Sequence, residues 1–169
     1  MTISADPRAP MQIDRLRLFR IVAVLSAITA YGTIVLGGTV RGMDAGLACL
    51  DWPLCNNSIV PNLGDPRVAV EYAHRLVAAL TSLFILLTMA FAVLWHRAQT
   101  PIVTLSVMTF AVLVAQVAFG ALTITSSLNW VVVTIHLALG TATLALALMV
   151  ALIVLRVPTG APPSEPSAG

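Results

Sequence analysis

Long apolar stretches without a charged residue are the main feature of this sequence. Residues 21–40 and 76–94 contain no Asp, Glu, Lys or Arg, and neither does the segment 98–155. At ~1.5 Å per residue, about 20 apolar residues cross the ~30 Å hydrocarbon core of a bilayer. The third segment is long enough for two crossings, and the polar residues 125–129 near its middle predict a turn. We therefore predict transmembrane helices over residues 21–40, 76–94, 102–124 and 130–155.

The composition excludes an ordinary soluble domain. Hydrophobic residues make up 59% of the chain and charged residues only 9%, too few to cover a globular surface. The nine basic residues are all Arg and the net charge is +2, which leaves no basic stripe for a nucleic-acid backbone. We expect an all-α membrane protein. Its four-transmembrane-helix bundle, at 18–156, lies between a cytoplasmic N-terminal segment, 1–17, and a disordered cytoplasmic tail, 157–169.

The arginines predict how the helices are oriented in a cell membrane. Basic residues gather on the cytoplasmic side of membrane proteins. With four crossings, six arginines lie on one side and three on the other. We therefore expect both termini to be cytoplasmic and the connection 41–75 to be an extracytoplasmic outer loop. The first group is Arg8, Arg15, Arg17, Arg20, Arg97 and Arg156, and the second is Arg41, Arg67 and Arg75.

Both cysteines of the chain, Cys49 and Cys55, fall in this outer loop. The extracytoplasmic compartment permits disulfides, so a bond between them is the first interpretation. A redox-exchanging pair and a soft-metal site completed by an outer histidine are the alternatives. Connections of this length usually cover or complete a site. We expect the loop to lie over the outer mouth of the bundle.

Two histidines are predicted at a similar depth in the outer half of the bundle. His74 begins the second transmembrane helix and His136 lies near the start of the fourth. Each is followed four residues later by a small residue, Ala78 or Gly140, on its own helix face. One intramembrane histidine often makes only a hydrogen bond to a neighbouring helix, and small residues often serve close packing. A facing pair can instead supply both axial ligands of one haem iron.

Other polar residues cluster near the outer side of this predicted pocket. Glu71 precedes His74 by three residues, so its carboxylate could carry out proton chemistry there; alternatively it is a hydrated acid at a helix N-terminus. Arg41 and Arg75 could pair with haem propionates or simply mark the interface. Gln116 is expected to make an interhelical hydrogen bond.

Three segments together resemble the haem A synthase family. They are GGTVR at 37–41, GLACLDWPLC at 46–55 and EYAHR at 71–75. The resemblance continues through 116–123 and 136–140 and covers about residues 15–155. Its most specific part is the pair of cysteines around Asp-Trp-Pro-Leu. It implies that Cys49 and Cys55 form the family's loop disulfide, that Glu71 is the catalytic glutamate, and that His74 and His136 bind haem iron.

The activity implied by this resemblance is oxidation of the C8 methyl of haem O to a formyl group. The product, haem A, serves terminal oxidases, and a second haem, haem b, carries electrons. Haem O synthase and a terminal oxidase are therefore possible partners. Family members of usual size resemble two fused four-helix halves, whereas this chain has one half, so we expect a homodimer or larger oligomer. Residues 43–46 read Met-Asp-Ala-Gly where the family usually has Thr-Gly-Ser-Gly.

Two other functions are compatible with the same residues. A bis-histidine b-type membrane cytochrome would use His74 and His136 for electron transfer or haem handling, without modifying haem and without needing Glu71. A haem-free structural partner of an oxidase would use both histidines only for packing.

Overall fold

The computed structural model describes residues 9–158, with side chains from residue 14 onward. It confirms an all-α chain. Each of the four helices contains a segment long and apolar enough to cross a membrane, so the protein is a multi-pass membrane protein. Most of the predicted tail and the start of the predicted N-terminal segment lie outside the described residues. The helices are α1 (Ala9–Gly42), α2 (Pro66–Trp95), α3 (Thr100–Thr125) and α4 (Trp130–Arg156).

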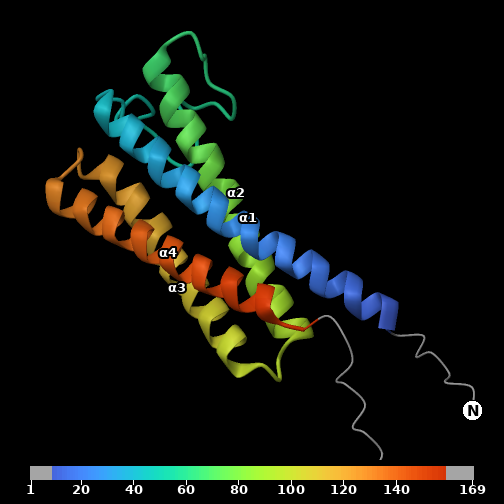
Figure 1. Ribbon diagram of the computed structural model, residues 1–169. Coiled ribbons are helices and arrows are strands. Elements are labelled where there is room, and N and C mark those ends of the chain that lie inside the picture. Colours follow the sequence, from blue (N-terminus) through green and yellow to red (C-terminus); the bar gives the residue numbers. More distant parts are fainter. Residues whose placement is uncertain (1–8, 159–169) are drawn as a thin grey trace, which may run out of the picture.

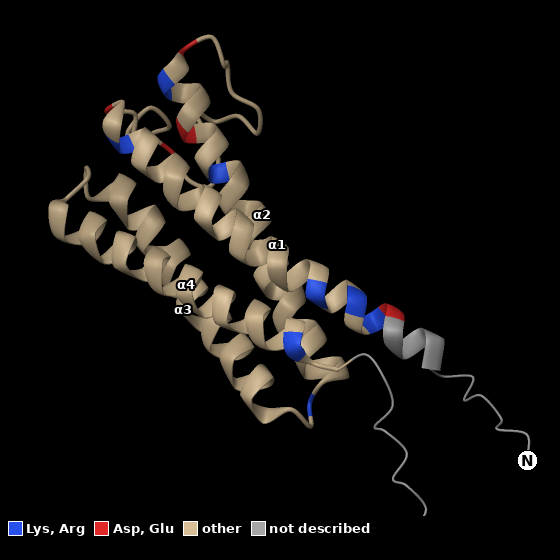
Figure 2. Ribbon diagram, viewed as in Figure 1, with Lys and Arg blue, Asp and Glu red and all other residues tan. Residues whose placement is uncertain are grey.

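The helices form an up-and-down bundle in which each packs against two neighbours. α1 lies against α2 and α4, and α3 lies against the same two helices. Figure 1 shows the α1–α2 loop and the α3–α4 turn at one end of the bundle, called here the loop end. Both ends of the described chain and the α2–α3 link are at the opposite, terminal end. Charged residues gather toward the two ends, and the middle of the bundle is free of them (Figure 2).

Two helices begin well before the apolar stretches that predicted them. α2 begins at Pro66 rather than at residue 76, because Asp65 caps it by accepting the backbone N–H of Arg67 at 2.8 Å. Proline is also favoured in the first helical turn. With 30 residues α2 is about 45 Å long, more than a bilayer core requires. α1 likewise begins at Ala9 and not at residue 21.

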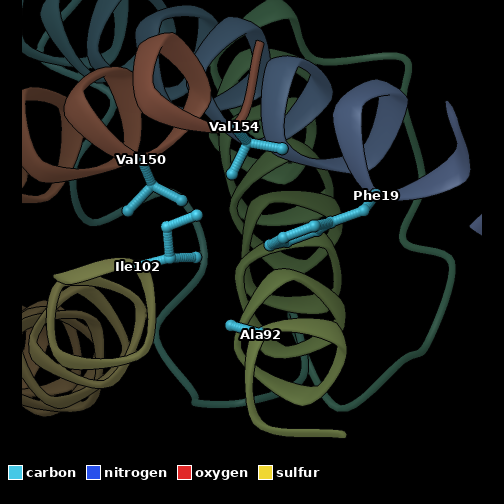
Figure 3. Packing of buried hydrophobic residues seen from close by; sticks show 5 residues of the cluster. All are labelled: Phe19, Ala92, Ile102, Val150 and Val154. Carbon is cyan, nitrogen blue, oxygen red and sulfur yellow. The ribbon is translucent and has the colours of Figure 1, made fainter. Parts of the chain in front are cut away.

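The best-packed core lies at the terminal end. The ring of Phe19 is fully buried there and stacks on His96 with ring centroids 5.0 Å apart. Arg20 donates to the main-chain carbonyls of Val154 and Val157 and so satisfies the last turn of α4. Figure 3 shows the five residues of the core cluster, which are Phe19, Ala92, Ile102, Val150 and Val154.

The two helical hairpins, α1–α2 and α3–α4, bury residues at equivalent positions. This is an internal structural repeat in which α1 corresponds to α3 and α2 corresponds to α4. Within each pair of corresponding helices, the paired residues are separated by the same number of residues along the chain. Phe19, Ala23, Ser26 and Ala30 of α1 correspond to Ile102, Ser106, Thr109 and Leu113 of α3. Thr81, Ile85, Thr88 and Ala92 of α2 correspond to Thr143, Ala147, Val150 and Val154 of α4.

Toward the loop end the helices no longer bury their side chains against one another. In α1 no residue after Ala30 is buried, and in α3 none after Leu113. The same holds for residues 72–80 of α2 and 130–139 of α4. Both histidines of the predicted site lie in this less tightly packed half of the bundle.

Candidate haem site

His74 is held against α1 by its ring nitrogen. Its Nδ1 atom lies 3.1 Å from the carbonyl oxygen of Thr33. One turn further along α1, Gly37 leaves space for the ring, because a Cβ at Gly37 would lie 3.1 Å from the imidazole Cε1. The α1–α2 packing therefore fixes where this imidazole lies.

His136 has the equivalent environment in the second hairpin. Its Nδ1 atom lies 3.1 Å from the carbonyl oxygen of Gln116 in α3. A Cβ at Gly120 would lie 3.1 Å from the imidazole Cε1, as at Gly37. The internal repeat thus presents one histidine from each hairpin in the same way.

These contacts prepare both imidazoles to bind a metal ion. A carbonyl oxygen can only accept, so Nδ1 of each ring carries the proton and the Nε2 lone pair is left for a ligand. Donation from Nδ1 to a carbonyl is the usual way in which a ligating histidine is oriented. His74 and His136 are also close enough to interact electrostatically. Two such neutral imidazoles suit the iron of one haem.

The side chain of Gln116 lies between α3 and α4, beside the glycine that follows His136 by one turn. The side-chain carbonyl oxygen of Gln116 is buried without a hydrogen-bond partner. Gly140 lies beside this amide, since a Cβ there would be 2.9 Å from Nε2 of Gln116. The interhelical hydrogen bond expected of Gln116 comes from its main-chain carbonyl instead of its side chain.

Glu71 is buried and paired, unlike a hydrated acid at a helix terminus. Only 4% of the residue is exposed, and it lies in the second turn of α2. One carboxylate oxygen, Oε2, accepts the backbone N–H of Cys49 at 2.9 Å. The other, Oε1, lies 2.5 Å from Nη2 of Arg75. The alternative of a hydrated N-terminal acid is therefore wrong.

Arg75 points into the loop. Its guanidinium donates to the main-chain carbonyls of Cys49 at 2.8 Å and Asp51 at 2.6 Å, and also to that of Leu54. Arg41, in the last turn of α1, is exposed. Whether either arginine contacts a haem propionate stays a prediction.

The loop carries the disulfide that was the first interpretation of the two cysteines. Cys49 and Cys55 are bonded and both are buried. Asp51 lies in the ring that this disulfide closes, and its carboxylate accepts the backbone N–H groups of the two residues that follow the ring, Asn56 at 2.5 Å and Asn57 at 2.8 Å. Burial alone raises the pKa of Asp51, but these donors and the charge of Arg75 outweigh it, so the pKa lies below its ordinary value.

The loop also reaches the second hairpin. A Cβ at Gly46 would lie 3.1 Å from Cδ2 of Leu128 in the α3–α4 turn. This contact agrees with the expectation that the loop lies over the mouth of the bundle. Asn56, which the sequence pattern did not indicate, also helps to hold the loop together. Its side-chain amide donates to the main-chain carbonyl of Ala48 at 3.1 Å.

Fold and site together define a four-helix membrane protein with a histidine pair suited to haem. A sequence comparison identifies the family. Residues 20–168 match the COX15-CtaA family, described as cytochrome oxidase assembly protein. The chain belongs to this family.

Three curated relatives show how much is shared. Haem A synthase of Lysinibacillus sphaericus is 30% identical over 152 residues, which cover 87% of this chain and 48% of the relative. Haem A synthase of Symbiobacterium thermophilum is 43% identical over 60 residues, 36% of this chain and 19% of the relative. Protohaem IX farnesyltransferase 1 of Natronomonas pharaonis is 34% identical over 102 residues, which cover 60% of this chain and 21% of the relative. The chain spans about half the length of these relatives or less.

Proposed function

We propose that this protein oxidises the C8 methyl group of haem O to a formyl group, producing haem A. The observation that carries the proposal is the equivalent placement of His74 and His136, each with Nδ1 on a carbonyl and Nε2 left for iron. Membership of a family that includes haem A synthases supports the reaction. A haem bound between these histidines supplies the iron redox couple and, when it is haem O, the methyl group.

In this proposal Glu71 receives protons at the substrate methyl. Its carboxylate lies one turn from His74 on α2 and is held by the Arg75 guanidinium and the Cys49 N–H. Each of these donors uses one lone pair of a carboxylate oxygen, so further acceptor capacity is left. Converting the methyl group to a formyl group also requires an oxygen source from outside the chain. With water as this source the reaction releases protons and electrons and needs an electron acceptor, whereas with dioxygen it needs an electron donor.

We further propose that two or more copies associate. One histidine pair holds one haem, whereas the proposed reaction uses haem O as substrate and haem b as electron carrier. A symmetric dimer is the simplest closed assembly that brings two sites together. One relative is a protohaem IX farnesyltransferase, which supports haem O synthase, a farnesyltransferase, as the partner that supplies the substrate. The family description, cytochrome oxidase assembly protein, supports a terminal oxidase as the partner that receives haem A.

The second candidate is a b-type cytochrome that does not modify haem. Both oxygens of Glu71 are already bound within the chain, which a purely structural glutamate would also show. Replacing Glu71 separates the two functions. In Glu71→Gln, the enzyme keeps its haem but makes no haem A, whereas the cytochrome keeps its reduced spectrum and its potential.

The test is extraction and mass identification of haem from protein purified out of cells that make haem O. Haem A or its hydroxylated precursor beside haem b supports the enzyme, and haem b alone supports the cytochrome. His74→Ala and His136→Ala should lose haem, while His96→Ala at the terminal end is the matched control and should keep it. Haem-free wild-type protein from haem-replete cells would overturn both functions.

The proposed orientation puts both termini in the cytoplasm and the disulfide loop outside it. The excess of arginines at the terminal end supports this orientation. Alkaline phosphatase, which is active only outside the cytoplasm, should be active when fused within the 43–65 loop and inactive at the C-terminus. The opposite pattern would reverse the orientation.

A further inference from the structure

Arg75 connects the disulfide ring to the proposed catalytic glutamate. Its guanidinium donates to three main-chain carbonyls, and all three belong to the ring closed by Cys49 and Cys55. The same group lies 2.5 Å from Oε1 of Glu71. One planar guanidinium group with five donors therefore joins the ring to Glu71.

The ring also binds Glu71 directly. The backbone N–H of Cys49 donates to Oε2 of the carboxylate at 2.9 Å, and Cys49 is fully buried. The side chains of Glu71 and Arg75 are only 5% and 15% exposed. One carboxylate oxygen is thus bound by a residue of the ring, Cys49, and the other by a side chain that itself binds the ring, Arg75. The position of the carboxylate should therefore depend on the closed ring.

We propose that Arg75 is a positioning residue that holds Glu71 against the disulfide ring, so that the carboxylate keeps its place only while Cys49 and Cys55 are bonded. This inference rests on the proposed role of Glu71 in methyl oxidation. The second hairpin has Val133 and Leu137 at the positions equivalent to Glu71 and Arg75. This pairing of a glutamate with an arginine is therefore found only in the first of the two hairpins. Lysine cannot replace Arg75, since one ammonium group cannot reach four acceptors in this fork geometry.

The experiment compares Arg75→Gln and Arg75→Lys with the matched control Arg67→Gln, which removes an exposed arginine of the same helix. Reduction of the disulfide by a phosphine is followed by maleimide labelling of the purified protein. Both Arg75 variants should be reduced roughly tenfold faster or more, as expected when charge-assisted hydrogen bonds are lost. The control should match the wild type. Equal reduction rates in all four proteins would overturn the proposal, whether or not the chain is an enzyme.

Turnover of haem O gives the second measurement. In Arg75→Gln, kcat should fall by about tenfold or more while KM and haem content stay within about twofold. Adding Arg75→Gln to a Cys49→Ser, Cys55→Ser protein should cause little further loss, because the ring no longer holds the carboxylate. Additive losses would contradict the proposal, and loss of haem with an unchanged reduction rate would assign Arg75 to a propionate instead. Wild-type protein without turnover would overturn the proposed function only, leaving the reduction rates to decide.

Discussion

His136 repeats in α4 the contact that His74 makes in α2. Each imidazole has its Nδ1 atom 3.1 Å from a main-chain carbonyl oxygen of the preceding helix. Each also lies against a glycine of that helix, at the same distance from where a Cβ would be. The two rings are thus oriented by backbone atoms of α1 and α3, and the packing of these helices controls the candidate site.

Gly37→Ala should weaken haem binding. The new Cβ would lie 3.1 Å from Cε1 of His74, and the ring cannot move away without lengthening its bond to Thr33. Overpacking of this kind costs about 1–3 kcal/mol, which corresponds to a loss of haem affinity of about 5- to 150-fold if it is felt only in the haem-bound state. Gly38→Ala is the control, because nothing lies within 4 Å of a Cβ there. Haem titration of both proteins gives the answer, and equal affinities would show that the ring is not confined by α1.

Gln116→Leu should stabilise the haem-free protein. The buried side-chain oxygen of Gln116 has no partner, and an unsatisfied buried carbonyl costs about 1–3 kcal/mol. Leucine has a similar volume and removes this cost. Thermal unfolding in detergent should show a higher Tm, with Gln99→Leu at an exposed position as the control. A lower Tm for Gln116→Leu would mean that the amide makes a favourable contact.

Arg20→Ala should loosen the end of α4. Arg20 donates to the carbonyl of Val157, which follows the last residue of α4, and to that of Val154, which also accepts the backbone N–H of Val157 at 3.3 Å. Losing charge-assisted hydrogen bonds of this kind costs about 1–3 kcal/mol. Amide hydrogen exchange at 150–157 should become faster, whereas Arg17→Ala, at an exposed position of α1, should leave it unchanged. Unchanged exchange in Arg20→Ala would rule out this capping role.

The terminal end should lose stability as the pH falls. Burial against Phe19 lowers the pKa of His96 below its ordinary value of 6.5, so the unfolded chain takes up a proton more readily than the folded one. The stability is therefore complete above pH 6.5 and falls as the pH drops through 6.5 toward the lower folded pKa. His96→Phe keeps a ring on Phe19 but cannot titrate. Chemical unfolding at about pH 8 and pH 5.5 should show a smaller loss in this variant, and equal losses would exclude His96 as the cause.

The apolar pattern predicted the four helices but not their full lengths. A bilayer crossing is visible because it needs about 20 uncharged residues in succession. The first turns of α2 contain Arg67, Glu71 and Arg75, which end an apolar stretch without ending a helix. Only the proline and the capping Asp65 indicate the true start at residue 66.

The candidate site was predicted as a set of residues but not as an arrangement. His74, His136 and Glu71 stand out because charged and ionisable groups are rare in apolar helices. Their partners do not, since every residue has a carbonyl and nothing in the sequence marks those of Thr33 and Gln116. The repeat of the two hairpins could not be recognised in the sequence either, because most equivalent positions carry different residues, such as Phe19 and Ile102.

The hairpins are equivalent in their histidines and unequal around them. The positions of Glu71 and Arg75 in one hairpin are taken by Val133 and Leu137 in the other, and among the described residues only the first hairpin carries a long loop. A haem held between His74 and His136, as proposed, would therefore have unlike surroundings on its two faces, charged on the side of His74 and apolar on the side of His136. The two orientations of an asymmetric porphyrin that are related by a half-turn would differ in energy for this reason, so the proposed enzyme could present one chosen substituent to the carboxylate. In the proposed reaction, the regioselectivity would then come from the unlike surroundings of two equivalently placed histidines.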